Sequence, residues 1–182
     1  MNRTRWVLVA IMAGSVPLLP TRLVGAPATS SNPTDARVAD ARNVISTEHA
    51  STDQFATEEA DSLFVQAGRL YAQRRFSEAI PLFQRVVELE PRHGNAFALL
   101  GGSYFQLGDY HQAIRAFEQA LALDEGIKLA YIGLVAANYL TRRVENAQEW
   151  LVRLVPLLNG EERDRYLATL SSQFPELTLP DS

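Results

Sequence analysis

Apolar residues recur at helical spacing in pairs of short segments over much of the chain. In residues 94–127 they fall three or four positions apart on both sides of a break at Gly108-Asp109, which predicts two amphipathic helices joined by a tight turn. Glycine suits this break because it adopts positive φ after a helix end without steric cost. The apolar positions of this helical hairpin are Phe97, Leu100, Tyr104, Phe105, Ala113, Phe117, Ala120 and Leu121.

The hairpin pattern repeats every 34 residues. Ala79, Ala113 and Ala147 occupy one frame, with a bulky residue three positions before and four positions after each alanine. These bulky residues are Phe76, Tyr110 and Val144, then Phe83, Phe117 and Leu151. One hairpin of this size cannot bury its apolar face alone, so the units are expected to stack into an all-α solenoid.

The repeat resembles the tetratricopeptide repeat. The second unit carries most of that family's pattern and departs from it at Glu125, where the family usually has proline. Its matching residues are Phe97, Leu100, Gly101, Tyr104, Ala113, Phe117 and Ala120. The resemblance implies a right-handed superhelix of three hairpins. We expect these at residues 60–93, 94–127 and 128–158 (together 60–158), then a capping helix at 159–175 and a tail at 176–182.

The first 57 residues differ in composition from the repeats. Residues 1–28 combine Arg3 and Arg5 with a short apolar run, residues 6–19, and small residues, which is typical of a secretory signal peptide. Cleavage is expected after Ala28, or after Ala26, although Pro27 disfavours the second site. The alternative is an uncleaved N-terminus that anchors the chain to a membrane. Residues 29–57, rich in Ser, Thr, Ala and Asp, are expected to form a flexible linker.

Export would place the mature chain in the periplasm or another envelope or lumenal space.

Composition also limits the chemistry of the chain. It has no cysteine, three histidines and a formal net charge of −4, which excludes disulfides and cysteine metal sites and disfavours nucleic-acid binding. No catalytic, metal-binding or cofactor-binding motif is found, so we expect a non-enzymatic protein with no cofactor.

Two arginine pairs occupy equivalent predicted turns, Arg74-Arg75 and Arg142-Arg143. They could bind an acidic partner or lipid head groups, or they could complement the dipole at helix C-termini; we favour the second interpretation.

The resemblance further implies that the first helix of each hairpin lines a concave groove. Such a groove would be apolar and aromatic here, and would suit a protein or peptide partner with hydrophobic anchors. The family's basic clamp for a terminal carboxylate is missing, because Phe64, Gly68 and Leu99 occupy its positions. The candidate partner-binding residues are Phe64, Tyr71, Phe105, Gln106, Ile132 and Tyr139.

These features predict a protein–protein interaction scaffold of the cell envelope. The alternatives are a self-associating oligomer whose groove is covered by its own chain, and a membrane-anchored assembly factor for a secretion or pilus-type complex.

Overall fold

The structure, a computed structural model, describes the backbone of residues 42–177 and the side chains of residues 55–177. Within these residues all regular structure is helical, which confirms the all-α solenoid. The expected signal peptide at 1–28 and the first part of the expected linker lie outside the described residues. The helices are α2 (Arg42–Ala72), α3 (Phe76–Leu89), α4 (Gly94–Leu107), α5 (Tyr110–Leu123), α6 (Lys128–Leu140), α7 (Val144–Leu154), η1 (Val155–Leu157) and α8 (Gly160–Gln173).

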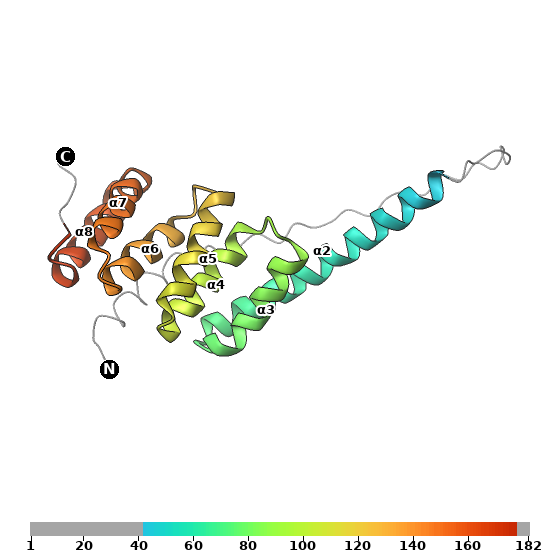
Figure 1. Cartoon of the computed structure of the whole chain (residues 1–182), viewed down its shortest axis with the longest axis horizontal. Helices are drawn as coiled ribbons and strands as arrows, with labels where there is room; N and C mark the ends of the chain where they lie inside the picture. The colour runs from blue at the N-terminus through green and yellow to red at the C-terminus, as the bar shows by residue number, and fades with distance from the viewer. Residues whose placement is uncertain (1–41, 178–182) are drawn as a thin grey trace.

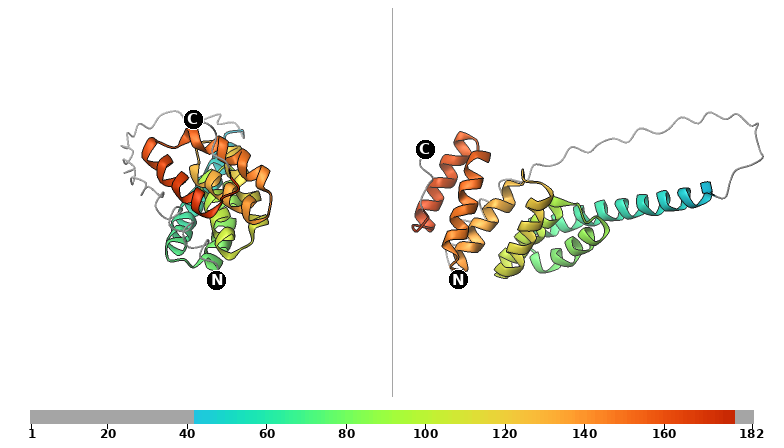
Figure 2. Two further views of the ribbon diagram at one scale, coloured as in Figure 1. Left: turned by 90° about the vertical axis from the view of Figure 1, so that its left-hand side faces the viewer. Right: turned by 45° about the horizontal axis from the view of Figure 1, so that its top comes forward.

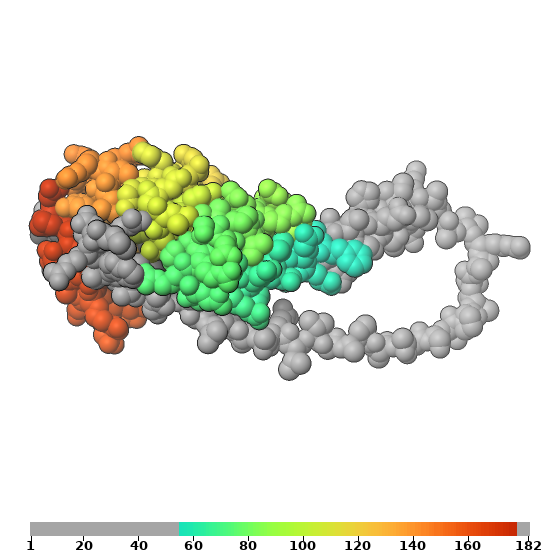
Figure 3. Space-filling view, turned by 90° about the horizontal axis from the view of Figure 1, so that it is seen from below, coloured from blue at the N-terminus to red at the C-terminus, as the bar shows by residue number. Residues whose placement is uncertain are grey.

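The helices form three antiparallel hairpins, α2–α3, α4–α5 and α6–α7, which follow one another along the molecule and end at α8 (Figure 1). The second and third sequence units begin at the residues where α4 and α6 begin. The first helices of successive hairpins are also in contact, α2 with α4 and α4 with α6. The space-filling view shows the surfaces of these elements following one another in chain order (Figure 3).

Helix α2 is much longer than its partner, 31 residues against 14 in α3, and projects well beyond the hairpin (Figures 1 and 2). Residues 42–57 are therefore helical, although they were expected to belong to a flexible linker. The physical reason is that helix growth is cooperative. Once the packed part of α2 is formed, each further residue adds one hydrogen bond, and this stretch contains no proline or glycine to stop it.

The α4–α5 and α6–α7 hairpins are held together by one aromatic ring and two glycines. Phe117 of α5 is fully buried, with Gly101 of α4 and Gly133 of α6 against its ring. A β-carbon at Gly101 would lie 2.8 Å from the ring, and one at Gly133 would overlap it still more severely. Only glycine at both positions lets α4 and α6 approach the ring this closely.

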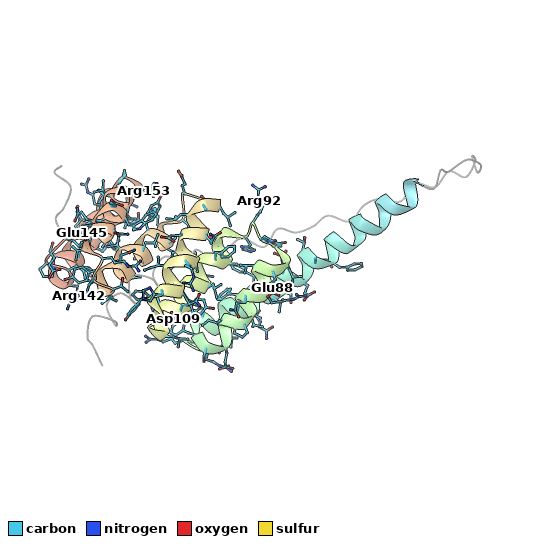
Figure 4. The ribbon with its side chains drawn as sticks, in the orientation of Figure 1. Glu88, Arg92, Asp109, Arg142, Glu145 and Arg153 are labelled. Atoms are coloured by element: carbon cyan, nitrogen blue, oxygen red, sulfur yellow. The ribbon has the colours of Figure 1, made fainter. Side chains whose placement is uncertain are left out.

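The three hairpin turns share one backbone conformation. Gly108 has φ 88°, and the equivalent residues Arg74 and Arg142 have φ 63° and 61°. In each turn the amide of this residue and the next amide donate to carbonyls of the preceding helix, at 2.9–3.0 Å. These turns lie along one edge of the molecule, where Figure 4 labels Asp109 and Arg142, whereas Arg92 in a loop between hairpins lies at the other edge.

Of each arginine pair, the first residue lies in the turn two positions after the last residue of the preceding helix. The second residue precedes the next helix: Arg75 is the N-cap of α3, and its Nε donates to Glu78 Oε1 at 2.7 Å. This hydrogen bond lowers the pKa of the Glu78 carboxyl. The equivalent residue Arg143 is the N-cap of α7. The dipole interpretation therefore fits Arg74 and Arg142 but not the residues after them.

An ion pair joins α8 to the third hairpin, and a capping box forms the start of α8. The Lys128 Nζ donates to Glu162 Oε2 at 2.7 Å, and the hydrogen bond lowers the pKa of Glu162. Glu162 also exchanges hydrogen bonds with Asn159, the N-cap of α8. Tyr166 and Leu170 of α8 are buried. The start of α8 is thus fixed against the start of α6.

Replacing Gly133 with alanine should destabilise the protein by about 2 kcal/mol or more, because the new β-carbon must displace the Phe117 ring in a packed core. Urea unfolding followed by circular dichroism measures this loss. Gly68→Ala is the matched control: its β-carbon would meet nothing within 4 Å, so the better helix former should keep or raise stability. Equal losses from the two variants would contradict the close-packing role of Gly133.

Replacing Arg142 with glycine should raise the free energy of unfolding by about 0.5–1 kcal/mol, since glycine removes the cost of a side chain at positive φ and loses part of that gain to backbone entropy. Arg142→Ala keeps a β-carbon but removes the charge, and it should give no comparable gain. A gain from alanine equal to that from glycine would assign the effect to charge instead of to backbone conformation.

Candidate partner-binding face

The six candidate residues lie on the three first helices, which the fold places side by side. Helix α2 carries Phe64 and Tyr71, α4 carries Phe105 and Gln106, and α6 carries Ile132 and Tyr139. All six side chains are uncharged. The side of the three helices that bears these residues is called the first-helix face below.

At the α2 end of this face the rings are partly exposed and packed against neighbours. The Phe64 ring lies 4.5 Å from that of His93 and 6.0 Å from that of Phe83, centroid to centroid. Its remaining surface is open, and so is the position beside Gly68 one helical turn later. This end of the face therefore has aromatic surface that a partner can contact.

Tyr71 fills the space above Gly102 in the next hairpin. Its ring lies 5.3 Å from that of Phe76, and its hydroxyl oxygen would be 2.8 Å from a β-carbon at Gly102. Burial raises the pKa of Tyr71 to about 12. Gly102 accepts this tyrosine of its own chain, because a ring of that size fits only where the neighbouring helix lacks a side chain.

Two candidates lie in the core. Phe105 and Ile132 are only 1% and 4% exposed, and the Phe105 ring packs 5.4 Å from that of Tyr110. Contrary to the sequence prediction, they present no open surface, since both belong to the cluster of buried side chains that runs from α4 to α8. Binding of a partner by the six residues as a set stays a prediction.

The last two candidates, Gln106 and Tyr139, are partly buried. The Tyr139 ring packs 4.4 Å from the ring of Phe174, which follows α8. The first-helix face is thus open at its α2 end and covered at Tyr139 by the C-terminal part of the chain. Its uncharged side chains offer apolar contact and amide hydrogen bonds but no ion pair.

A cleft of about 520 Å³ that the sequence did not predict lies between α3 and α5, the second helices of two neighbouring hairpins. Phe97 and Tyr104 of α4, expected as core residues, line it, and Gln84 Nε2 donates to the Tyr104 hydroxyl at 2.9 Å. The sequence did offer one signal for this cleft, the glutamines of the two helices: Gln84 on α3, and Gln112 and Gln119 on α5. The other lining residues are Leu100, Gln112, Arg115, Ala116, Glu118 and Gln119.

The described residues contain no cluster of three or more histidine, cysteine, aspartate or glutamate side chains that could hold a metal ion. Ser103, in the Gly101-Gly102-Ser103 segment, is buried and donates its hydroxyl to the Leu99 carbonyl at 2.9 Å within its own helix. Among helices of the described part, none is long and apolar enough to cross a membrane.

Two family profiles match the chain in overlapping segments. The family described as "Anaphase-promoting complex, cyclosome, subunit 3" matches residues 47–120, and the family described as "Tetratricopeptide repeat" matches residues 99–162. The chain therefore contains tetratricopeptide repeats, which the second family matches over residues 99–162 and which the structure forms as stacked helical hairpins.

Curated relatives are similar over the repeats. Hsc70-interacting protein 1 of Drosophila melanogaster is 31% identical over 110 residues, which are 60% of this chain and 29% of that protein. Hsp70-Hsp90 organizing protein of Triticum aestivum is 35% identical over 66 residues, 35% of this chain and 11% of that protein. The chain thus spans less than a third of the length of either relative.

Solved structures share the fold. The first TPR of Spaghetti (RPAP3) bound to HSP90 peptide SRMEEVD has a TM-score of 0.58 and 22% identity, covering 65% of this chain and 94% of that one. The Yersinia enterocolitica type III secretion translocator chaperone SycD has a TM-score of 0.58 and 19% identity, with 65% and 91% covered. At these identities the likeness concerns the architecture.

The protein should lose stability as the pH rises from about 10 to 12, partly because of Tyr71. Its folded-state pKa of about 12 lies above the ordinary value of 10.0, so the folded state keeps a proton that the unfolded chain gives up in that range. Unfolding free energies measured across this pH range should fall less steeply for Tyr71→Phe than for the unchanged protein. Identical slopes would show that the Tyr71 hydroxyl is not protected by burial.

Proposed function

We propose that this protein is a non-enzymatic adaptor of the cell envelope that binds a peptide segment of another protein through its first-helix face. The observation that carries the proposal is the α2 end of that face. There the Phe64 ring keeps open surface beside Gly68, on helices whose spacing is fixed by the packing of the hairpins. Partly exposed aromatic rings on a rigid scaffold are typical anchors for a peptide.

The relatives support peptide binding in general and also suggest a difference in partner. One fold neighbour is bound to the peptide SRMEEVD, which carries three acidic residues. The six candidate residues of this chain include no cation, and the only lysine, Lys128, is paired with Glu162. The carboxylates of such a peptide would lose hydration against these six side chains and would gain no ion pair from them. We therefore propose a partner with hydrophobic anchors.

The envelope location rests on residues 1–28 alone. A short basic start followed by a short apolar run and small residues supports export, with cleavage after Ala28 or Ala26. Retention of this segment as a membrane anchor is the alternative outcome.

Affinity purification after crosslinking in cells tests the proposal. Phe64→Ala/Gln106→Ala should fail to recover the partner that the unchanged protein recovers. With the partner purified, the affinity of this variant should be at least about tenfold weaker, a loss of about 1.4 kcal/mol. The control variant is Val65→Ala/Leu107→Ala. It changes the next residue on each of the same two helices, and both of its wild-type side chains are 52% exposed.

Loss of the partner in the control variant as well, or in neither variant, would contradict binding at this face. Recovery of further copies of the chain alone would favour self-association. The mass of the recovered protein tests export separately: a mature chain should begin at Thr29 or Pro27, and a full-length chain in the cytosolic fraction would contradict export.

A further inference from the structure

The chain makes a tight turn after α8. The amide of Phe174 donates to the Leu170 carbonyl at 2.7 Å and ends the helix, and the amide of Leu177 donates to the Phe174 carbonyl at 3.0 Å. Pro175 and Glu176, at the tip, are exposed, whereas Phe174 and Leu177 are 1% and 8% exposed. We call residues 174–177 the C-terminal turn. It presents an aromatic and an aliphatic side chain, three residues apart, toward the protein.

The surface that receives these side chains includes the α6 end of the first-helix face. The Phe174 ring lies 4.4 Å from that of Tyr139, and Phe174 and Leu177 belong to the same cluster of buried side chains as Ile132 and Ala136 of α6. Ile132 and Tyr139 are the two candidate partner-binding residues of the third hairpin. The C-terminal turn therefore covers the part of the face that would complete a groove begun at Phe64.

The C-terminal turn is attached differently from the helices. It follows the end of α8, so its opening breaks only the last hydrogen bond of that helix, from the Phe174 amide to the Leu170 carbonyl, and leaves the other helical bonds intact. Burial of two apolar side chains opposes the entropy of ordering four residues, and these two contributions are of similar size. Such segments open locally while the rest of the protein stays folded.

We infer that the C-terminal turn is a ligand held in cis: it occupies the Tyr139 end of the first-helix face and opens to release it. The occupied surface accepts a segment with an aromatic residue and an aliphatic residue three positions later, as in Phe174-Pro175-Glu176-Leu177. Occupation by the turn is independent of the proposed function. Only one further step rests on the proposed function: that an external partner, with the same spacing of an aromatic and an aliphatic residue, displaces the turn.

A peptide added in trans tests this occupation without any external partner. The probe is a synthetic peptide of residues 174–182, FPELTLPDS, titrated against the full chain and against full-length Phe174→Ala/Leu177→Ala. The variant should bind the peptide at least about tenfold more tightly than the unchanged protein, in which the site is filled. A control peptide in which the residues at positions 174 and 177 are both alanine should not bind. The control protein Pro175→Ala/Glu176→Ala should behave like the unchanged protein.

A folded double variant that does not bind the peptide, or equal binding by both proteins, would overturn the inference. A second measurement decides the matter even if the double variant fails to fold. The chain has no cysteine, so a single cysteine at position 177 or 176 is a clean probe for alkylation by iodoacetamide. Leu177→Cys should react at least about tenfold more slowly than Glu176→Cys, at a rate that hardly changes in urea below the unfolding transition.

A Leu177→Cys rate that rises steeply with urea would mean that the site opens only with global unfolding. The C-terminal turn would then be a permanent part of the core. Failure of either test would leave the proposed function standing, because neither test uses the partner or the α2 end of the face.

Discussion

The packing of one phenylalanine ring against two glycines determines how the second and third hairpins are spaced. Phe117 comes from the second helix of its hairpin, and it is covered by Gly101 of the same hairpin and Gly133 of the next. Because neither contact tolerates a β-carbon, the first helices α4 and α6 are held at a short and fixed separation. The part of the first-helix face on α4 and α6, and the seat of the C-terminal turn on α6, depend on that separation.

Much of the fold could be predicted from sequence because the repeat period and the turn residues are features of neighbouring positions in the chain. The 34-residue period places each helix, and Gly108-Asp109 marks a turn whose conformation Arg74 and Arg142 also adopt. The extension of α2 over residues 42–57 was not predictable from composition, because that stretch has no packing pattern. It is helical because it continues a helix that is packed further along.

The candidate site was predicted less completely, since burial depends on neighbours distant in sequence. Phe105 and Tyr139 occupy equivalent places in two units, yet one packs on Tyr110 and the other on Phe174, beyond the last repeat. The cleft beside Tyr104 likewise combines Gln84 and Gln119 from different hairpins. The period shows which residues are equivalent, but it does not show which of them the ends of the chain will cover.

The most direct test of the account is site-specific photocrosslinking in living cells, with a photoreactive phenylalanine analogue placed at position 64 or at position 65. A crosslinked partner is expected in the envelope fraction from position 64, whose ring lies on the first-helix face, and none is expected from the exposed position 65 on the same helix. A partner captured from position 65, or from position 119 beside the cleft but not from 64, would contradict binding at the first-helix face.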